Sequence, residues 1–369
     1  MRNYVSLVLA LLVYTTITFY IGWNGWVWLQ SFSSISSWYL YGLIVALFAY
    51  SYFIGHRLTA LSFLKTLGAY WMGFFQYSLL LLPTSNVIVW LLTFTAVPRT
   101  TAIFIVGSIT IVIYITIFSL GSYHAFSPVV RTYNIHIPKK VNRKTLRIAM
   151  ASDMHFGGMS GMNHLKRLVK NINDMEPDLI LFPGDIIDDD PAYYIKKNMR
   201  DEMKKLRAPL GTYGVLGNHE YYGGAIPEFL DEMGKSNVRI LLDDVIKIEE
   251  SFYIVGRKDK TDRKRESFTN LVEKLDKNLP IIAMDHQPYD LQSAADNGVD
   301  LLLCGHTHRG QMAPNHIITR RMYEIDWGYK QKGTMHTIVS SGFGFWGPPL
   351  RIGSRSEIIR IDVTFDGLE

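Results

Sequence analysis

The stretch LLLCGHTHRGQM, residues 301–312, joins a short apolar run to two histidines that follow it almost at once. Three leucines and a cysteine have the length and composition of a buried strand. The run stops at Gly305, and His306 and His308 follow with a single residue between them. Imidazole is a common ligand of transition-metal ions. The stretch therefore predicts a strand whose carboxyl end presents metal-ligating side chains.

Four earlier apolar runs end in the same way, each in Asp, Asn or His. They are LRIAMASDMH (146–155), DLILFPGD (178–185), YGVLGNHE (213–220) and LPIIAMDHQP (279–288). Between the first two, Leu165, Leu168 and Ile172 recur at helical spacing, and this alternation of strand and helix predicts an α/β domain. Side chains at the carboxyl ends of strands in one sheet converge on a common crevice. We therefore expect five strands to send polar side chains to one place.

The side chains at these five strand ends have the chemistry of divalent-metal ligands. Carboxylates, imidazoles and an amide oxygen suit Mn, Fe or Zn, and the lack of thiolates in the set argues against a structural zinc site. In Asp-x-His and His-x-His both members can be aimed from one strand end, because residues i and i+2 share a face in extended chain. The candidates are too many for one ion and suitable for two: Asp153, His155, Asp185, Asn218, His286, His306 and His308.

The motifs DMH, GDIID, GNHE, the lone His286 and GHTH, in this order, resemble those of the calcineurin-like metallophosphoesterase superfamily over about residues 146–369. GNHEYY, GHTHRGQ and GFGFWGPPLRIG are further similar to its bacterial YkuE/YaeI-like branch, in which glycine more often stands where this chain has Arg309. The resemblance implies a four-layer α/β/β/α sandwich, with two sheets packed face to face and helices outside.

The resemblance also implies how two ions would be held. One ion would take Asp153, His155, Asp185 and His308, and the other Asp185, Asn218, His286 and His306, so that Asp185 bridges them. A metal-bridging hydroxide would attack the phosphorus in line. His219 would face the phosphate, stabilise the developing charge and protonate the leaving oxygen, and Asp188 would orient His219.

The first 124 residues are predicted to lie largely in a lipid bilayer and not in water. They contain no acid and only four charged side chains, Arg2, Arg57, Lys65 and Arg99. Three apolar runs are long enough to span a bilayer, at 4–23, 38–55 and 101–123. A fourth uncharged stretch, 67–97, has Pro83 in its middle and is either one kinked span or two short pieces. We expect four spans.

The resulting organisation is a transmembrane helical domain at 1–124, a basic juxtamembrane linker at 125–145 and a metallophosphoesterase domain at 146–369. With four spans, Arg2, the 57–65 loop and the segment after residue 123 share one side, which the positive-inside rule makes cytoplasmic. The prediction is a multi-pass protein of the cell membrane with its catalytic domain in the cytoplasm. A fifth span would move that domain outside.

Basic residues in and directly after the linker occur without an acid between residues 125 and 152: Arg131, Lys139, Lys140, Arg143, Lys144 and Arg147. Such a cluster either attracts anionic lipid headgroups or is an ordinary stop-transfer flank. Beyond residue 124 the chain holds 34 of its 38 basic residues and all 33 acids, so nucleic acid is not an expected partner. Cys304, the only cysteine, is expected in the core, and His164 on a solvent-exposed helix face.

The leading hypothesis is a membrane-anchored, dinuclear metal-dependent phosphohydrolase that acts on phosphodiesters, with a lipid or lipid-linked phosphoester as the preferred substrate. A second hypothesis makes the membrane region a sensor or transport-like module with the phosphoesterase as output, because four spans exceed what anchoring requires. A nuclease or a protein phosphatase is a third. The near-balanced charge disfavours the nuclease, and Asp189 stands where protein phosphatases usually carry Arg.

Overall fold

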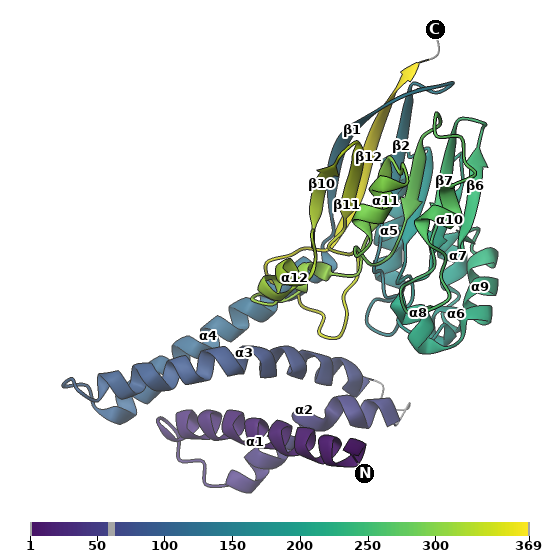
Figure 1. Ribbon diagram of the computed structural model, residues 1–369. Coiled ribbons are helices and arrows are strands. Elements are labelled where there is room, and N and C mark those ends of the chain that lie inside the picture. Colours follow the sequence, from purple (N-terminus) through teal and green to yellow (C-terminus); the bar gives the residue numbers. More distant parts are fainter. Residues whose placement is uncertain (1, 58–62, 368–369) are drawn as a thin grey trace. The chain divides into compact units, whose positions relative to one another are not determined.

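The computed structural model describes residues 2–57 and 63–367, and the chain divides into two units. The first unit is Met1–Gly121 with Gly347–Leu350, and the second is Ser122–Trp346 with Arg351–Glu369. Figure 1 shows the contrast between them, since the first is built of long helices and the second of strands and shorter helices. Of the charged loop expected at 57–65, residues 58–62 lie outside the described residues.

The first unit contains four long helices, of which the last continues into the second unit after Gly121: α1 (Arg2–Gln30), α2 (Trp38–Arg57), α3 (Phe63–Leu92) and α4 (Arg99–Phe126). Within the described residues these four are long and apolar enough to cross a membrane, which confirms the predicted number. Pro83 lies inside α3, so this stretch is one helix and not two pieces. Neighbouring groups in a bundle can satisfy the carbonyl that a membrane proline frees.

Close backbone approach and aromatic packing hold the helices of this unit together. A Cβ added to Gly68 of α3 would lie 2.3 Å from the backbone nitrogen of Tyr52 in α2, so only glycine allows this approach. Ile21, Ala49 and Trp71 form a small core shared by α1, α2 and α3. Hydroxyl groups link α3 to α4, where Ser78 Oγ lies 2.8 Å from Tyr114 Oη.

Two six-stranded sheets form the centre of the second unit. The first has the order β1-β12-β2-β3-β4-β5 and contains β1 (Val129–Val141), β2 (Thr145–Met150), β3 (Leu179–Pro183), β4 (Thr212–Val215), β5 (Arg239–Ile240) and β12 (Glu357–Gly367). The second has the order β10-β11-β9-β8-β7-β6 and contains β6 (Asp244–Ile248), β7 (Phe252–Gly256), β8 (Ile281–Met284), β9 (Leu301–Cys304), β10 (Gly328–Lys332) and β11 (Met335–Val339).

Three apolar clusters order these sheets and the helices into four layers. One cluster joins the facing sides of both sheets and includes Ile148, Leu181, Ile282 and Leu303. A second packs the outer side of the first sheet against helices, among them α5 (Met162–Asp174), α6 (Ala192–Lys196), α7 (Met199–Met203) and α9 (Ile226–Lys235). A third does the same for the second sheet with α10 (Phe268–Val272) and α11 (Leu291–Asp296). The expected α/β/β/α sandwich is confirmed.

The segment expected to be a linker contributes strand β1 instead. It runs parallel to β12 over the register Val129↔Glu357 to Val141↔Gly367, with one irregularity after Ile137. Alternating side chains explain this, because Ile135 and Ile137 are buried while their neighbours face outward. The basic residues on either side of them, such as Arg131 and Lys139, concealed this strand pattern in the sequence.

The basic side chains of this segment meet acids of the same unit. Four of the six form ion pairs, which are Arg131–Glu357 at 2.6 Å, Lys139–Asp300 at 2.6 Å, Arg143–Asp178 at 3.3 Å and Arg147–Asp362 at 3.1 Å. These four basic side chains therefore have acidic partners within the second unit.

His164 is buried, contrary to the expectation of an exposed residue, with 2% of its surface accessible. Its ring stacks on Phe343 with centroids 4.1 Å apart, and its Nε2 lies 3.2 Å from the Phe343 carbonyl oxygen. The polar neighbours on α5 suggested exposure, but His164 shares the inward face with Leu165 and Leu168. Cys304 is buried in the core as predicted.

Candidate metal centre

Parallel strands bring the predicted ligands together at their carboxyl ends. β2, β3 and β4 are neighbours in the first sheet, and β8 and β9 are neighbours in the second. Potential ligand atoms of one buried group, Asp153, His155 and His308, all lie within 4.8 Å of one another, and so do those of Asp185, His286 and His306. The seventh candidate, Asn218, begins helix α8 (Asn218–Gly223), and its Oδ1 is 3.2 Å from His286 Nε2.

Asp185 lies between these groups. Its Oδ2 is 3.1 Å from His286 Nε2 and 3.8 Å from His155 Nε2. Burial opposes the charge on this carboxylate, but the nearby imidazoles, His286 first, hold the pKa of Asp185 below its usual value. A charged carboxylate that faces imidazoles on two sides is placed to serve both groups.

The ligand-bearing backbone is not the extended chain that the sequence suggested. Five of the candidates have positive φ angles, at Asp153 (53°), His155 (45°), Asp185 (51°), His306 (72°) and His308 (48°). All five lie beyond the ends of their strands, so their side chains are aimed by left-handed turns and not by alternation along a strand. Each such residue costs about 1–3 kcal/mol and persists only where its surroundings fix it.

Asp153 illustrates how the surroundings fix such a residue. Its Oδ1 accepts a hydrogen bond from the backbone N–H of His306 at 2.7 Å, and its Oδ2 accepts one from the Ser152 hydroxyl. Gly305 makes room for the carboxylate, since a Cβ there would lie 2.3 Å from Asp153 Oδ2. The glycine of the GHTH motif is therefore required by the first carboxylate of the site.

A buried carboxylate that the sequence analysis missed, Glu220, fixes the turn at Asp185. Its oxygens accept hydrogen bonds from the backbone N–H groups of Gly217 (2.7 Å), Ile186 (2.7 Å), Ile187 (3.1 Å) and Asp185 (3.2 Å). Burial raises the pKa of Glu220 to about 8, and these donors oppose that rise. Its signal was the last letter of GNHE, an acid in the first turn of a helix that begins after glycine.

The residues present fit a divalent cation. His155 Nε2 and His308 Nε2 are 3.1 Å apart, and His308 Nε2 is 3.6 Å from Asp153 Oδ1. Burial lowers the pKa of His155 to about 3 and that of His308 well below its usual value, so both rings are neutral and can offer lone pairs. His286 donates from Nδ1 to the Pro183 carbonyl oxygen at 2.8 Å, which leaves its Nε2 for a ligand bond.

His219 lies beside these groups, with its ring 4.5 Å from that of His155 in an edge-to-face arrangement. Its Nδ1 is 2.7 Å from Asp189 Oδ1, while Asp188 Oδ1 is 3.9 Å away. The carboxylate in hydrogen-bond contact is thus Asp189 and not the expected Asp188, because a left-handed turn at Asp189 (φ 58°) directs its side chain back to the histidine. Burial lowers the pKa of His219. The hydrogen bond to Asp189 and the negative charges of nearby carboxylates together outweigh burial and raise the pKa of His219 to about 9.

Arg351 is a second residue that the sequence analysis missed. Its guanidinium is fully buried, and Nη2 lies 3.2 Å from His308 Nδ1 while donating to the carbonyl oxygens of Gly344 (2.6 Å) and Gly342 (3.1 Å). It thus sets the orientation of the His308 ring from behind. Its signal, one arginine after two prolines in GFGFWGPPLRIG, did not distinguish it from a surface residue. Arg309, by contrast, stacks 3.9 Å above the Trp327 ring.

Comparison with known proteins gives concordant matches. A sequence model of the calcineurin-like phosphoesterase family matches residues 146–310. An uncharacterized metallophosphoesterase of Helicobacter pylori is 33% identical over 58% of this chain and 59% of its own length. The uncharacterized metallophosphoesterase YkuE of Bacillus subtilis is 31% identical over 58% of this chain and 77% of its own length.

A transmembrane protein with metallophosphoesterase domain from Bos taurus is 28% identical over 63% of this chain and 56% of its own length. The chain therefore spans somewhat less than three fifths of the Helicobacter and bovine relatives. The matches agree with the motifs and with the sandwich. The bovine relative is described as transmembrane by its name, and this chain has four helices that are long and apolar enough to cross a membrane.

Proposed function

The chain belongs to the calcineurin-like metallophosphoesterase family, and we propose on that premise that it is a membrane-anchored, dinuclear metal-dependent phosphohydrolase that prefers phosphodiesters. The observation that carries the proposal is the position of Asp185, whose Oδ2 lies 3.1 Å from one imidazole of the site and 3.8 Å from another. A bridging carboxylate of this kind is what two closely spaced ions require.

Two ions would divide the ligands as the family resemblance implies. One would be held by Asp153, His155, Asp185 and His308, and the other by Asp185, Asn218, His286 and His306. The mixture of carboxylate, amide and imidazole donors suits Mn, Fe or Zn. When bound, such ions supply a hydroxide near neutral pH and neutralise charge on the phosphoryl oxygens.

The protein's own residues orient the reaction around these ions. His219, held through Nδ1 by Asp189, presents its other ring nitrogen as a donor for the developing charge and as the acid for the leaving oxygen. The backbone N–H of His219 also donates to Asp185 Oδ1 at 3.0 Å, so one turn positions the acid and the bridging carboxylate. Asp188 contributes negative potential near both His155 and His219.

The substrate that we propose is a lipid or lipid-linked phosphoester, which the membrane helices keep at the surface where the enzyme is anchored. The four apolar helices support a multi-pass membrane protein. We place the protein in the cell membrane with its catalytic unit in the cytoplasm, in accord with the distribution of Arg and Lys. Protease protection of the second unit in oriented vesicles tests the side of the membrane.

Hydrolysis of a chromogenic phosphodiester, beside the matching monoester, tests the chemistry. Full-length protein in detergent with added Mn should cleave the diester faster, and Asp185→Asn should lower turnover at least about 10³-fold, since it removes the shared charge but keeps the shape. Circular dichroism and gel filtration establish that the variant is folded. If the protein binds metal but cleaves neither ester, the proposal is wrong.

A further inference from the structure

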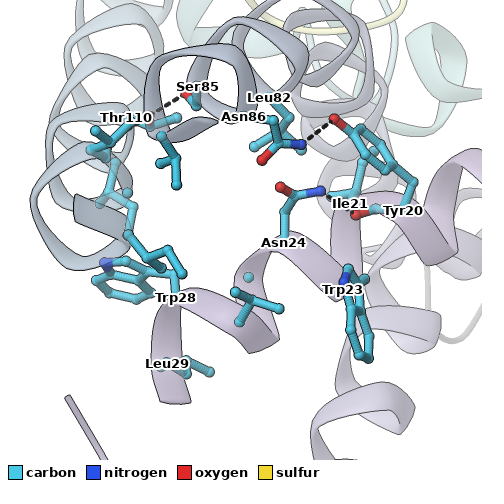
Figure 2. Close-up of a pocket in the computed structure, with 18 of the residues that line it drawn as sticks. Tyr20, Ile21, Trp23, Asn24, Trp28, Leu29, Leu82, Ser85, Asn86 and Thr110 are labelled. Atoms are coloured by element: carbon cyan, nitrogen blue, oxygen red, sulfur yellow. Dashed lines mark hydrogen bonds between the residues drawn. The ribbon is translucent and has the colours of Figure 1, made fainter. Parts of the chain in front are cut away.

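The first unit contains a partly open cavity of about 1040 Å³ that no part of the proposed reaction uses. Residues of all four helices line it, and most of the lining side chains are aromatic or aliphatic, including Trp28, Trp71 and Phe74. A few polar side chains interrupt this surface (Figure 2). A large apolar cavity with a few convergent polar groups is the usual form of a small-molecule site.

Two asparagines turn acceptor oxygens into this cavity. Asn24 donates from Nδ2 to the Tyr20 carbonyl oxygen at 2.9 Å, and Asn86 donates from Nδ2 to the Tyr20 hydroxyl at 2.8 Å. These bonds direct both amide oxygens away from Tyr20 and into the open space, as Figure 2 shows. No described residue donates a hydrogen bond to either oxygen. In an apolar surrounding, such acceptors favour a ligand that carries N–H or O–H donors.

A charged residue at the cavity places a second requirement on the ligand. Arg99, at the start of α4, is the one charged side chain among the residues that line the cavity, and the described part of the first unit contains no acid. Within a helical unit that provides no counter-charge, this cation complements an anionic group of a ligand. Its position at a helix end is the level at which lipid phosphates lie.

The charged, polar and apolar residues that line the cavity lie at different depths along the helices. Asn24 and Asn86 each lie six residues before the end of their helix, or about 9 Å along the axis from the level of that end. Thr110, which also lines the cavity, is about 16 Å along α4 from Arg99. A ligand would therefore place its anion outermost, its hydrogen-bond donors next and its hydrocarbon deepest.

We propose that this cavity binds a lipid phosphate that carries hydroxyl or amide donors directly below its phosphate group. Arg99 binds the phosphate, the Asn24 and Asn86 oxygens accept the donors, and the aromatic wall holds the hydrocarbon chain. An ordinary diacylglycerol phosphate matches the charge but offers ester oxygens where donors are needed.

This site is separate from the metal centre. All residues that line the cavity belong to the first unit, whereas the candidate metal ligands all belong to the second. We therefore treat a lipid bound there as a ligand of the membrane unit and not as the hydrolysed substrate. The sensor hypothesis for the membrane region requires a site of this kind.

Lipid retention measured by native mass spectrometry tests the proposal. The protein is the full chain with Asp185→Asn and without added metal, so that binding is independent of hydrolysis. Three probes separate the requirements: ceramide 1-phosphate has both phosphate and donors, phosphatidic acid has phosphate with ester oxygens, and ceramide lacks the phosphate. Ceramide 1-phosphate should bind several-fold more tightly than either of the others.

Single substitutions with a matched control then test which residue causes each lipid preference. Arg99→Gln should reduce the preference over ceramide about fivefold, as expected for one charge near a membrane surface, while Lys65→Gln, outside the cavity, should not. Asn24→Leu and Asn86→Leu should abolish the preference over phosphatidic acid. Equal binding of the three lipids by the unsubstituted protein would overturn the proposal, as would equal effects of Arg99→Gln and Lys65→Gln.

Discussion

The two units of this chain differ in what their polar side chains contact. In the helical unit many hydroxyl groups bond back to their own helix, as Thr16 does to the Leu12 carbonyl at 2.8 Å and Thr116 to the Val112 carbonyl at 2.8 Å, and some, such as Ser78, also reach a neighbouring helix. In the sandwich unit, polar side chains from different strands meet, as Asp153 and His308 do. Local pairing suits a unit that cannot rely on water, whereas long-range convergence builds a site.

Removal of the metal should have the largest effect, and this effect should differ most between the two units. A chelator should lower phosphoester hydrolysis to background, because the ligand groups lose their ions, and added Mn should restore it. The helical unit contains no comparable site in its described residues, so its far-ultraviolet circular dichroism should not change. Simultaneous loss of helical signal would show that the helical unit depends on the metal-loaded sandwich unit for its stability.

Substitutions around His219 should have the next largest effect. His219→Ala should lower kcat about 10²- to 10³-fold by removing the acid, and Asp189→Asn should lower it about tenfold by releasing the ring. Asp188→Asn serves as the matched control and should have the smaller effect, because its carboxylate lies 3.9 Å from His219 Nδ1. Separate kcat and KM values check this, and a larger loss for Asp188→Asn would return the orienting role to that residue.

Glu220→Gln should destabilise the sandwich unit by about 2–3 kcal/mol, because an amide group would oppose backbone N–H groups that now have acceptors. Hydrogen exchange provides the local measurement, since the amides of Ile186 and Ile187 should lose protection. Glu228→Gln, an exposed change on α9, is the control and should alter stability by less than about 0.5 kcal/mol. Unchanged protection would mean that other contacts fix the turn.

The smallest effect is expected between α3 and α4. Ser85 Oγ and Thr110 Oγ1 are 2.7 Å apart, yet each also bonds to its own helix at 2.8 Å. Ser85→Ala should therefore cost only about 0.6 kcal/mol in thermal unfolding in micelles. Thr116→Val, which removes only a local bond, should cost less. If Ser85→Ala lowered the free energy of unfolding by more than about 2 kcal/mol, hydrogen bonds between helices would matter more in this unit than the contrast with the sandwich unit implies.

The sequence predicted which side chains come together at the candidate metal centre better than it predicted their backbone geometry. Residue type and order were sufficient for Asp153 or His306, because apolar runs mark strands and strands share an edge. The sign of φ leaves little trace in the sequence, so the choice between Asp188 and Asp189 could not be made. Arg351 and strand β1 depend on partners far along the chain, and residue patterns do not identify such partners.

Strand β1 also constrains the order in which the protein can be completed. Its partner in the sheet is β12, which is synthesised roughly 220 residues later and then lies between β1 and β2. At about 5–20 residues per second, β1 leaves the ribosome on the order of 10–40 s before β12 exists. A chain truncated before residue 357 would carry all seven candidate metal ligands and still lack the strand that joins β1 to the sheet. Completion of this sheet therefore depends on β12, which is synthesised late.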